Sequence, residues 1–165
     1  MLTIRPETAD DEDAIRMVNL AAFPTAQEAD LVQQLREDSD SEISLVAEDE
    51  GTIVGHVLLS RMKVAGDGRP FRALGLGPVA VLPDRQRQGI GGALIEEALR
   101  LAQDRDEEAV FLVGEPDYYQ RFGFSAEAAV PFASPYAGPY FMARAFVPLP
   151  NRGEAAYAPA FEKLS

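Results

Sequence analysis

The stretch VAVLPDRQRQGIGG, residues Val79–Gly92, is the most informative part of this chain. Its β-branched residues predict the end of a strand, which Pro83 terminates, and a glycine-rich turn then leads directly into a helical pattern. Glycine lets the backbone approach a ligand closely, and a helix N-terminus offers free N–H groups and a partial positive charge. The stretch therefore predicts a strand–loop–helix unit that can bind phosphate, with Arg85 and Arg87 adding positive charge.

Two other phosphate-binding motifs match this stretch poorly. A P-loop ends in Gly-Lys-Ser/Thr, which this sequence lacks. A dinucleotide-binding fingerprint places its glycines directly after the strand, whereas the five residues Leu82–Gln86 separate Val81 from this loop. A tight turn without any ligand is the alternative interpretation, and spacing alone leaves both open.

Around this stretch, hydrophobic periodicity and turn residues predict a mixed α/β fold with a mainly antiparallel first half. The expected strands are Leu2–Arg5, Ile43–Glu48, Thr52–Met62, Phe71–Leu82, Ala109–Gly114 and Phe141–Leu149. The expected helices are one that begins near Thr8 and ends before Pro24, two over Thr25–Arg36 and Gln88–Asp104, and one or two turns within Asp117–Phe122. Gly77-Pro78 should interrupt the long strand, because proline cannot donate to a sheet ladder. No structure is predicted for residues 125–140 or 150–165, although Tyr157 and Phe161 indicate that the last segment packs on the body of the protein.

The composition is typical of one globular domain spanning residues 1–165. The chain has 15 basic and 27 acidic residues, a net charge of −12, which disfavours binding to nucleic acid phosphates. It has no cysteine, which excludes disulfides, thiolate metal sites and a cysteine nucleophile. The acidic N-terminal region lacks a signal-peptide pattern, and no apolar run has the length of a membrane span. We expect a soluble cytoplasmic protein with neither nucleic acid nor membrane as a partner.

Three segments carry a resemblance to a known family. Gln86-x-x-Gly89-x-Gly91 resembles the Arg/Gln-x-x-Gly-x-Gly/Ala motif of the GNAT acetyltransferases, and Tyr119–Phe124 resembles their Tyr-x-x-x-Gly-Phe element. Together with Gly55–Ser60 and Leu76–Val81, these segments are similar to the YhbS-like predicted acetyltransferases. The resemblance extends over Ile4–Phe161, nearly the whole chain.

The resemblance implies a fold, a cofactor and the residues that bind it. The fold would be the GNAT fold, a twisted mixed sheet splayed at its centre with flanking helices, and the splay should begin at Gly77-Pro78. The cofactor would be acetyl-CoA. Its pantetheine arm would pair with the strand Val79, Ala80 and Val81. Its pyrophosphate would lie on the loop formed by Gln86, Arg87, Gln88, Gly89, Ile90, Gly91 and Gly92.

The same resemblance places Tyr119 where the family has its general acid, although a tyrosine there could also only pack. Tyr118 should pack, since adjacent helical residues do not face the same way. His56 is the only histidine and its ordinary pKa suits a general base, but a buried, hydrogen-bonded histidine is the alternative. Glu115 could accept a proton through water or cap a helix. Glu28 borders the acceptor site in this family or lies on a solvated helix face.

These features predict an N-acyltransferase that moves an acetyl group directly from acetyl-CoA to an amine in a ternary complex. A catalytically weak acyl-CoA-binding regulator and a protein-interaction module are the alternatives. The acceptor, a small-molecule or protein amine, stays open, and a homodimer is possible by family resemblance. The acids Asp10–Asp13 have no neighbouring histidine or cysteine and should charge a helix N-terminus, so no metal site is predicted.

Overall fold

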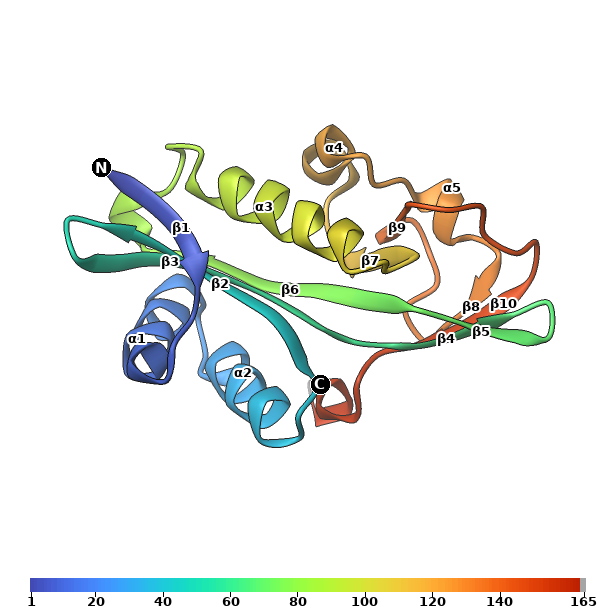
Figure 1. Cartoon of the computed structure of the whole chain (residues 1–165), viewed down its shortest axis with the longest axis horizontal. Helices are drawn as coiled ribbons and strands as arrows, with labels where there is room; N and C mark the ends of the chain where they lie inside the picture. Colours follow the sequence, from blue (N-terminus) through green and yellow to red (C-terminus); the bar gives the residue numbers. More distant parts are fainter. Residues whose placement is uncertain (164–165) are drawn as a thin grey trace.

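The computed structural model describes residues 1–163, whose main sheet has six strands in the order β1-β2-β3-β6-β7-β9 (Figure 1). Their bounds are β1 Leu2–Pro6, β2 Ser41–Asp49, β3 Thr52–Arg61, β6 Ala73–Val81, β7 Ala109–Val113 and β9 Phe141–Ala145. The pair β6–β7 is parallel, and the other pairs are antiparallel. The prediction of a mixed sheet with an antiparallel first half is confirmed.

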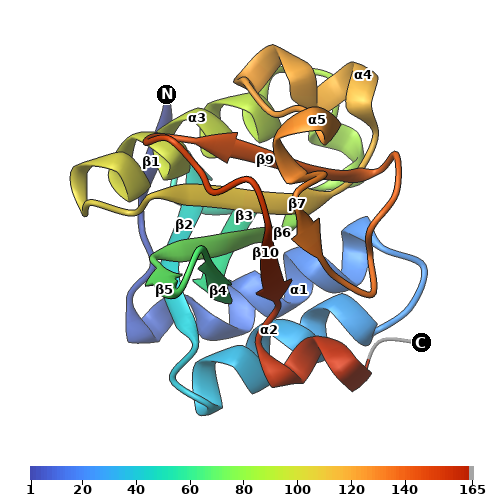
Figure 2. The same ribbon diagram turned by 90° about the vertical axis from the view of Figure 1, so that its right-hand side faces the viewer.

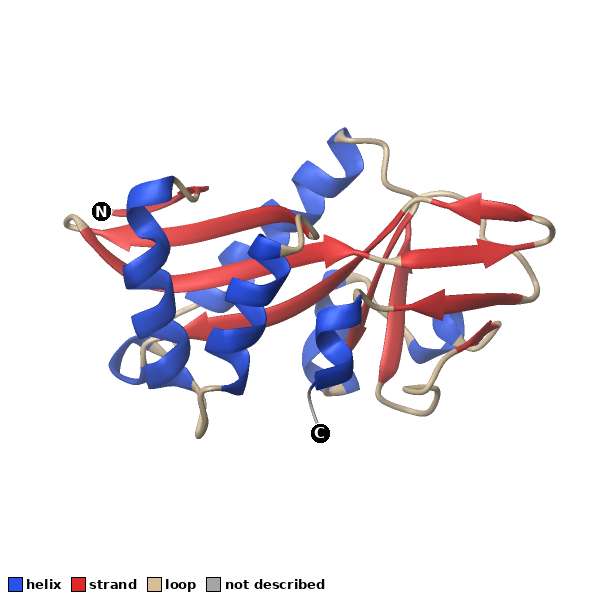
Figure 3. Ribbon diagram, turned by 90° about the horizontal axis from the view of Figure 1, so that it is seen from below, coloured by secondary structure: helices blue, strands red, loops and turns tan. Residues whose placement is uncertain are grey.

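Helices cover both faces of this sheet. The helices α1 (Glu12–Ala22) and α2 (Gln27–Glu37) lie on one face, and α3 (Ile90–Asp104) lies on the other (Figures 1 and 3). The short turn η1 (Ala9–Asp11) leads into α1. Because successive residues of a strand point to opposite faces, β3 directs Val57 and Leu59 to the α3 side and Leu58 to the α1–α2 side.

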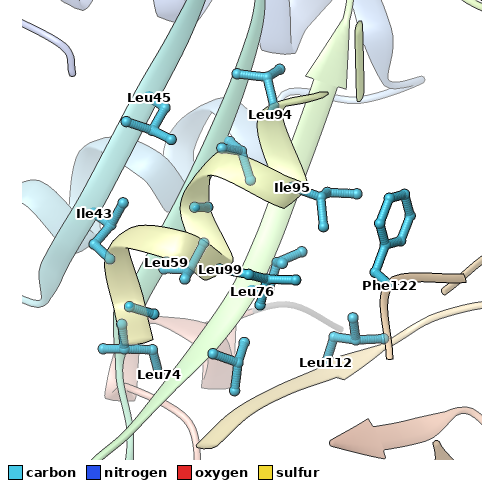
Figure 4. Close-up of a cluster of buried hydrophobic side chains, with 14 of the residues drawn as sticks. Ile43, Leu45, Leu59, Leu74, Leu76, Leu94, Ile95, Leu99, Leu112 and Phe122 are labelled. Carbon is cyan, nitrogen blue, oxygen red and sulfur yellow. The ribbon is translucent and has the colours of Figure 1, made fainter. Parts of the chain in front are cut away.

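In the part of the chain that the structure describes, the core under α3 is the largest of the three clusters of buried apolar side chains (Figure 4). The apolar positions of α3 recur three and four residues apart, so Leu94, Ile95 and Leu99 share the face that packs on β2, β3 and β6. Burying one such side chain contributes roughly 1.5–3 kcal/mol. Gly55 of β3 permits the close approach, since a Cβ atom there would lie 3.0 Å from Leu94 Cδ1.

The sheet opens between β6 and β7. Their pairing covers three residues of each strand and ends at Gly75 opposite Phe111. After Leu76 comes Gly77-Pro78 with a cis peptide bond, and the register of β6 against β3 shifts at the same place. The splay therefore begins within two residues of the predicted position.

A second, four-stranded sheet was not predicted. It has the order β5-β4-β10-β8, with β4 Lys63–Gly66, β5 Arg69–Phe71, β8 Phe132–Ala133 and β10 Gly153–Ala156 (Figure 2). The predicted strand Phe71–Leu82 is in fact two strands, because Phe71 pairs with Val64 in this second sheet and Arg72 separates it from β6. The predicted strand Phe141–Leu149 ends earlier, at Ala145.

Short elements complete the chain. The predicted turns within Asp117–Phe122 are α4 (Pro116–Tyr119) and η3 (Gln120–Phe122). Residues 125–140, for which no structure was predicted, contain α5 (Ala126–Ala129) and β8. After β10 the chain forms η4 (Pro159–Lys163), which contacts α2. No helix within residues 1–163 has the length and apolar character needed to cross a membrane.

Candidate active site

The glycine-rich loop ends in a helix N-terminus with free backbone donors. Gly89 is the N-cap of α3 and has a φ of 83°, a conformation that suits glycine. The first bond of the helix runs from Ala93 N–H to Gly89 O at 3.0 Å. The N–H groups of Ile90, Gly91 and Gly92 therefore have no acceptor within the helix. Such a turn favours the binding of an anion, because the partial positive charge of the helix N-terminus and the free N–H donors act on the same point in space.

Side chains hold this loop in place. Gln86 donates from Nε2 to Val81 O at 3.0 Å, which ties the loop to the end of β6. Arg85 was expected to add charge at the loop, but its guanidinium pairs with Asp49 on β2 at 2.8 Å. Gln88 also turns back, and its Oε1 accepts from Arg85 at 3.2 Å. Arg87 is exposed with a φ of 65°, so it is the arginine of this loop that remains accessible to a ligand.

The edge of β6 beyond the splay has unpaired backbone groups. Leu82 N–H donates to Val54 O at 2.9 Å, and hydrogen bonds to β3 recur at every second residue of an antiparallel strand. The N–H and C=O groups of Ala80 thus face β3, whereas those of Val79 and Val81 face the opening where β7 has departed. Since Gln86 occupies the Val81 carbonyl, the groups that stay free are the Val81 N–H and both groups of Val79.

A cleft of about 450 Å³ lies beside this edge, bounded by α2, β6, the end of β7, α4 and the segment after β10. The residues that line it are mainly aromatic or apolar: Phe23, Gln27, Glu28, Leu31, Leu76, Gly77, Pro78, Val79, Val113, Tyr119, Tyr136, Tyr157 and Phe161. Its size is within the range of small-molecule sites.

Tyr119 joins the cleft to the core under α3. Its ring packs in edge or tilted contacts with Tyr118, Phe122 and Phe124, at centroid separations of 4.9, 6.5 and 6.2 Å. Burial raises the pKa of the Tyr119 phenol above its usual value, and the neighbouring Tyr118 raises it further. The hydroxyl is therefore protonated at neutral pH and can donate a proton.

A model of the acetyltransferase (GNAT) domain matches residues 3–126 of this chain. The chain belongs to the GNAT family of acetyltransferases. The N-acetyltransferase YjhQ of Escherichia coli (strain K12) is 35% identical over 150 residues, which are 89% of this chain and 77% of YjhQ. The family prediction, and with it the prediction of an acetyltransferase, is confirmed.

Two solved structures share the whole fold with this GNAT protein. A GNAT acetyltransferase from Brucella melitensis in complex with acetyl-CoA is 36% identical and has a TM-score of 0.82. The match covers 98% of each of the two chains. YhbS from Escherichia coli in complex with CoA is 28% identical and has a TM-score of 0.86. The match covers 99% of this chain and 93% of the YhbS chain. The predicted GNAT fold is thereby confirmed.

The structure of this GNAT chain does not bring His56 into the cleft. His56 is fully buried on the α1 side of β3, on the face of the sheet away from α3. Its Nδ1 lies 3.3 Å from Asn19 Nδ2, and its Nε2 lies 2.9 Å from Ser44 Oγ. Burial, with a smaller effect from Arg36, lowers the pKa of the imidazole to about 3. His56 is thus a buried, hydrogen-bonded histidine, which was the alternative to a general base.

Glu115 lies next to the cleft without lining it. It is the N-cap residue of α4, and its side chain is exposed. Its backbone carbonyl accepts hydrogen bonds from the N–H groups of Tyr118 and Tyr119, both at 3.1 Å. Tyr118 points to the glycine-rich loop, since its hydroxyl lies 3.5 Å from the position that a Cβ atom of Gly91 would take.

The sequence did not reveal that Tyr157 belongs to this site. It follows β10, and its ring lies on Gly75, where a Cβ atom would be 2.6 Å from Tyr157 Cε1. The aromatic residues of the last segment predicted packing against the body, but no local pattern showed that they pack at the splay. Glu28, by contrast, was singled out and does line the cleft.

A larger hollow, of about 1050 Å³, lies on the second sheet among β4, β5, β8 and β10. It is remote from the loop in sequence and is built from different strands. The buried polar atoms without a partner in residues 1–163 do not include any from its lining, whereas two of them lie in the cleft beside β6. We therefore take the cleft as the candidate active site.

Proposed function

We propose that this GNAT enzyme transfers an acetyl group directly from acetyl-CoA to an amine while both are bound. One observation carries the proposal: the free edge of β6 runs from the cleft to the free N–H groups of the Gly89–Gly92 turn. An acyl donor with a pyrophosphate at one end and a thioester at the other can lie along both. The Brucella melitensis and Escherichia coli structures with acetyl-CoA and CoA support this assignment.

Each part of this path has a chemical role in the proposal. The N–H groups of Ile90, Gly91 and Gly92 hold the pyrophosphate, with Arg87 and Gln88 at its exposed side. Val79 and Val81 align the pantetheine arm with their outward-facing backbone groups, whereas those of Ala80 pair with β3, and Gln86 supports the strand by fixing the end of β6. The free N–H of Val79, which lines the cleft, is a donor that can stabilise negative charge on the thioester oxygen.

Acetyl-CoA supplies the activated acyl group. The amine nitrogen forms a bond to the acetyl carbon, and the bond from that carbon to the CoA sulfur breaks. Tyr119 gives its hydroxyl proton to the departing thiolate and regains one from water. The proton released by the amine nitrogen leaves to solvent. The chain has no cysteine that could carry the acyl group in between.

The experiment is a release assay with acetyl-CoA and a panel of amines. Because the chain has no cysteine, a thiol reagent reports free CoA without background from the protein. We expect CoA release that depends on the amine and a product that carries one acetyl group. Without an amine, the mass of the protein should stay unchanged, since no acyl-enzyme forms. Tight CoA binding with no release for any amine would instead indicate an acyl-CoA-binding regulator.

A further inference from the structure

The cleft contains two buried oxygen atoms without a hydrogen-bond partner. They are Oε1 of Glu28, from α2, and the hydroxyl of Tyr157, from the segment after β10. A buried polar atom without a partner lowers stability unless something else supplies the missing bond. These two atoms therefore point to a ligand that donates to a carboxylate and hydrogen-bonds to a phenol.

Tyr157 is held firmly in its position. Its ring lies on Gly75 and contacts Tyr136 edge-on at 5.3 Å and Phe161 at 4.9 Å between centroids. Burial raises the pKa of its phenol far above the usual value, so it stays neutral. The hydroxyl is thus a fixed, uncharged group in the wall of the cleft.

Glu28 gives the cleft its charge. It is the one carboxylate among the lining residues, which include no lysine, arginine or histidine. Within residues 1–163, no cation forms an ion pair with it. A half-buried carboxylate without a counter-ion favours a ligand that carries one positive charge.

The remaining walls are apolar and aromatic. Phe23, Leu31, Tyr136 and Phe161 line the cleft together with Glu28 and Tyr157, and Pro78 of β6 lines it as well. Aromatic faces attract an ammonium group as well as an apolar body. A polyamine or aminoglycoside would place several ammonium groups against these walls, where a single carboxylate is available to pair with them.

We propose that the acceptor is a small monoamine with an aromatic or apolar body, whose ammonium group is bound by Glu28 and whose polar substituent is bound by Tyr157. The bound ammonium loses one proton to solvent before its nitrogen attacks the acetyl carbon. This proposal rests on the proposed function, because it names the substrate class of the same site. Glu28 and Tyr157 then determine which amine is acetylated, and Tyr119 acts at the thioester.

The first experiment compares amines as acceptors for the wild-type enzyme. The panel contains 2-phenylethylamine, tyramine, spermidine, kanamycin and a lysine-containing peptide. We expect the highest kcat/KM for the two arylalkylamines, and a preference for tyramine over 2-phenylethylamine that disappears in Tyr157→Phe. Turnover of spermidine, kanamycin or the peptide in preference to both arylalkylamines would overturn the acceptor class and leave the proposed acetyl transfer intact. CoA release with none of the five amines would contradict both.

The second experiment tests Glu28 by Glu28→Gln, which keeps the shape of the side chain and removes its charge. Loss of a charge-assisted hydrogen bond should raise the KM for 2-phenylethylamine about 10- to 100-fold, with the KM for acetyl-CoA unchanged. The matched control is Glu96→Gln, which makes the same change in charge at an exposed glutamate on α3. This variant should behave as wild type.

Binding measured without turnover completes the test. Calorimetry should show weaker binding of 2-phenylethylamine to Glu28→Gln, whereas the uncharged analogue 2-phenylethanol should bind wild type and variant equally. A thermal melt of each variant shows that the fold is retained. Equal affinity of 2-phenylethylamine for wild type and Glu28→Gln would overturn the role of Glu28.

Discussion

The ring of Tyr119 lies against the backbone of Gly114, so closely that a Cβ atom on residue 114 would be 2.8 Å from Tyr119 Cδ2. Gly114 directly follows β7, and Tyr119 ends α4. The absence of a side chain at Gly114 therefore allows the ring to reach the cleft. The position of the proposed acid depends on a glycine that itself carries no reactive group.

Gly114→Ala should displace the Tyr119 ring and lower turnover. Overpacking of this kind costs roughly 1–3 kcal/mol of stability, so the melting temperature should fall modestly while the protein still folds. The decisive measurement is a double-mutant cycle with Tyr119→Phe. If Gly114→Ala acts through the phenol, it should reduce the kcat of Tyr119→Phe much less than that of wild type. Fully additive losses would show that the two residues act separately.

Tyr119→Phe should lower kcat by roughly 10²–10⁴-fold, the usual contribution of one general acid. The loss should lie toward the low end, because a thiolate is already a fair leaving group. Affinity for acetyl-CoA and thermal stability should hardly change, since the ring and its contacts are kept. Tyr118→Phe, whose hydroxyl faces Gly91, is the control and should retain most of the turnover. Normal turnover in Tyr119→Phe would reduce Tyr119 to a packing residue.

Gly91→Asp should abolish CoA binding while leaving the fold intact. A Cβ atom at Gly91 would lie at least 3.5 Å from every heavy atom outside its own helix. An acidic side chain in the first turn of a helix is also stabilised by the helix dipole. The carboxylate would, however, repel the pyrophosphate. Gly91→Asn has almost the same shape without the charge and should lose much less affinity. Calorimetry with CoA separates the two effects, and unchanged affinity in Gly91→Asp would refute the loop assignment.

Acid should destabilise the protein through His56. The folded-state pKa is about 3, below the ordinary value near 6.5, so the unfolded chain binds the extra proton first. The stability from neutral His56 is complete above pH 6.5 and is lost as the pH falls from there toward 3, by at most about 1.4 kcal/mol per pH unit. Urea unfolding between pH 6.5 and 5 isolates this residue, because carboxylates titrate mainly below that window. The slope should be smaller in His56→Gln, and an equal slope would contradict the assignment.

Local signals in the sequence were enough to locate the strand–loop–helix unit. Pro83, the glycines and the apolar spacing of α3 all act within a few residues, so the end of β6, the loop and the body of the helix were placed correctly. The start of the helix was set two residues early, at Gln88 instead of Ile90. The left-handed backbone of Arg87 and Gly89, which delays the helix, follows from the turn as a whole.

Features that depend on distant partners were not visible in the sequence. Phe71 has the same strand-forming character as its neighbours, yet it pairs in the second sheet, because pairing depends on where β4 lies. The face that His56 takes depends on the register of β3 against β2 and β6. Glu28 and Tyr157 line the same cleft although they are far apart in the sequence, and no spacing rule links them.

The family model matches residues 3–126, and the cleft is lined by residues within this segment and by residues that follow it. The edge of β6 and the glycine-rich loop lie inside that segment, whereas Tyr136, Tyr157 and Phe161 lie beyond it. Changes in the segment after residue 126 would therefore alter part of the proposed acceptor site without touching the edge of β6 or the glycine-rich loop. The same division matters at the bench. An affinity tag placed directly after Phe161 would adjoin a residue that lines the cleft, whereas a tag before Met1 adjoins none, so the second position suits measurements of amine selectivity.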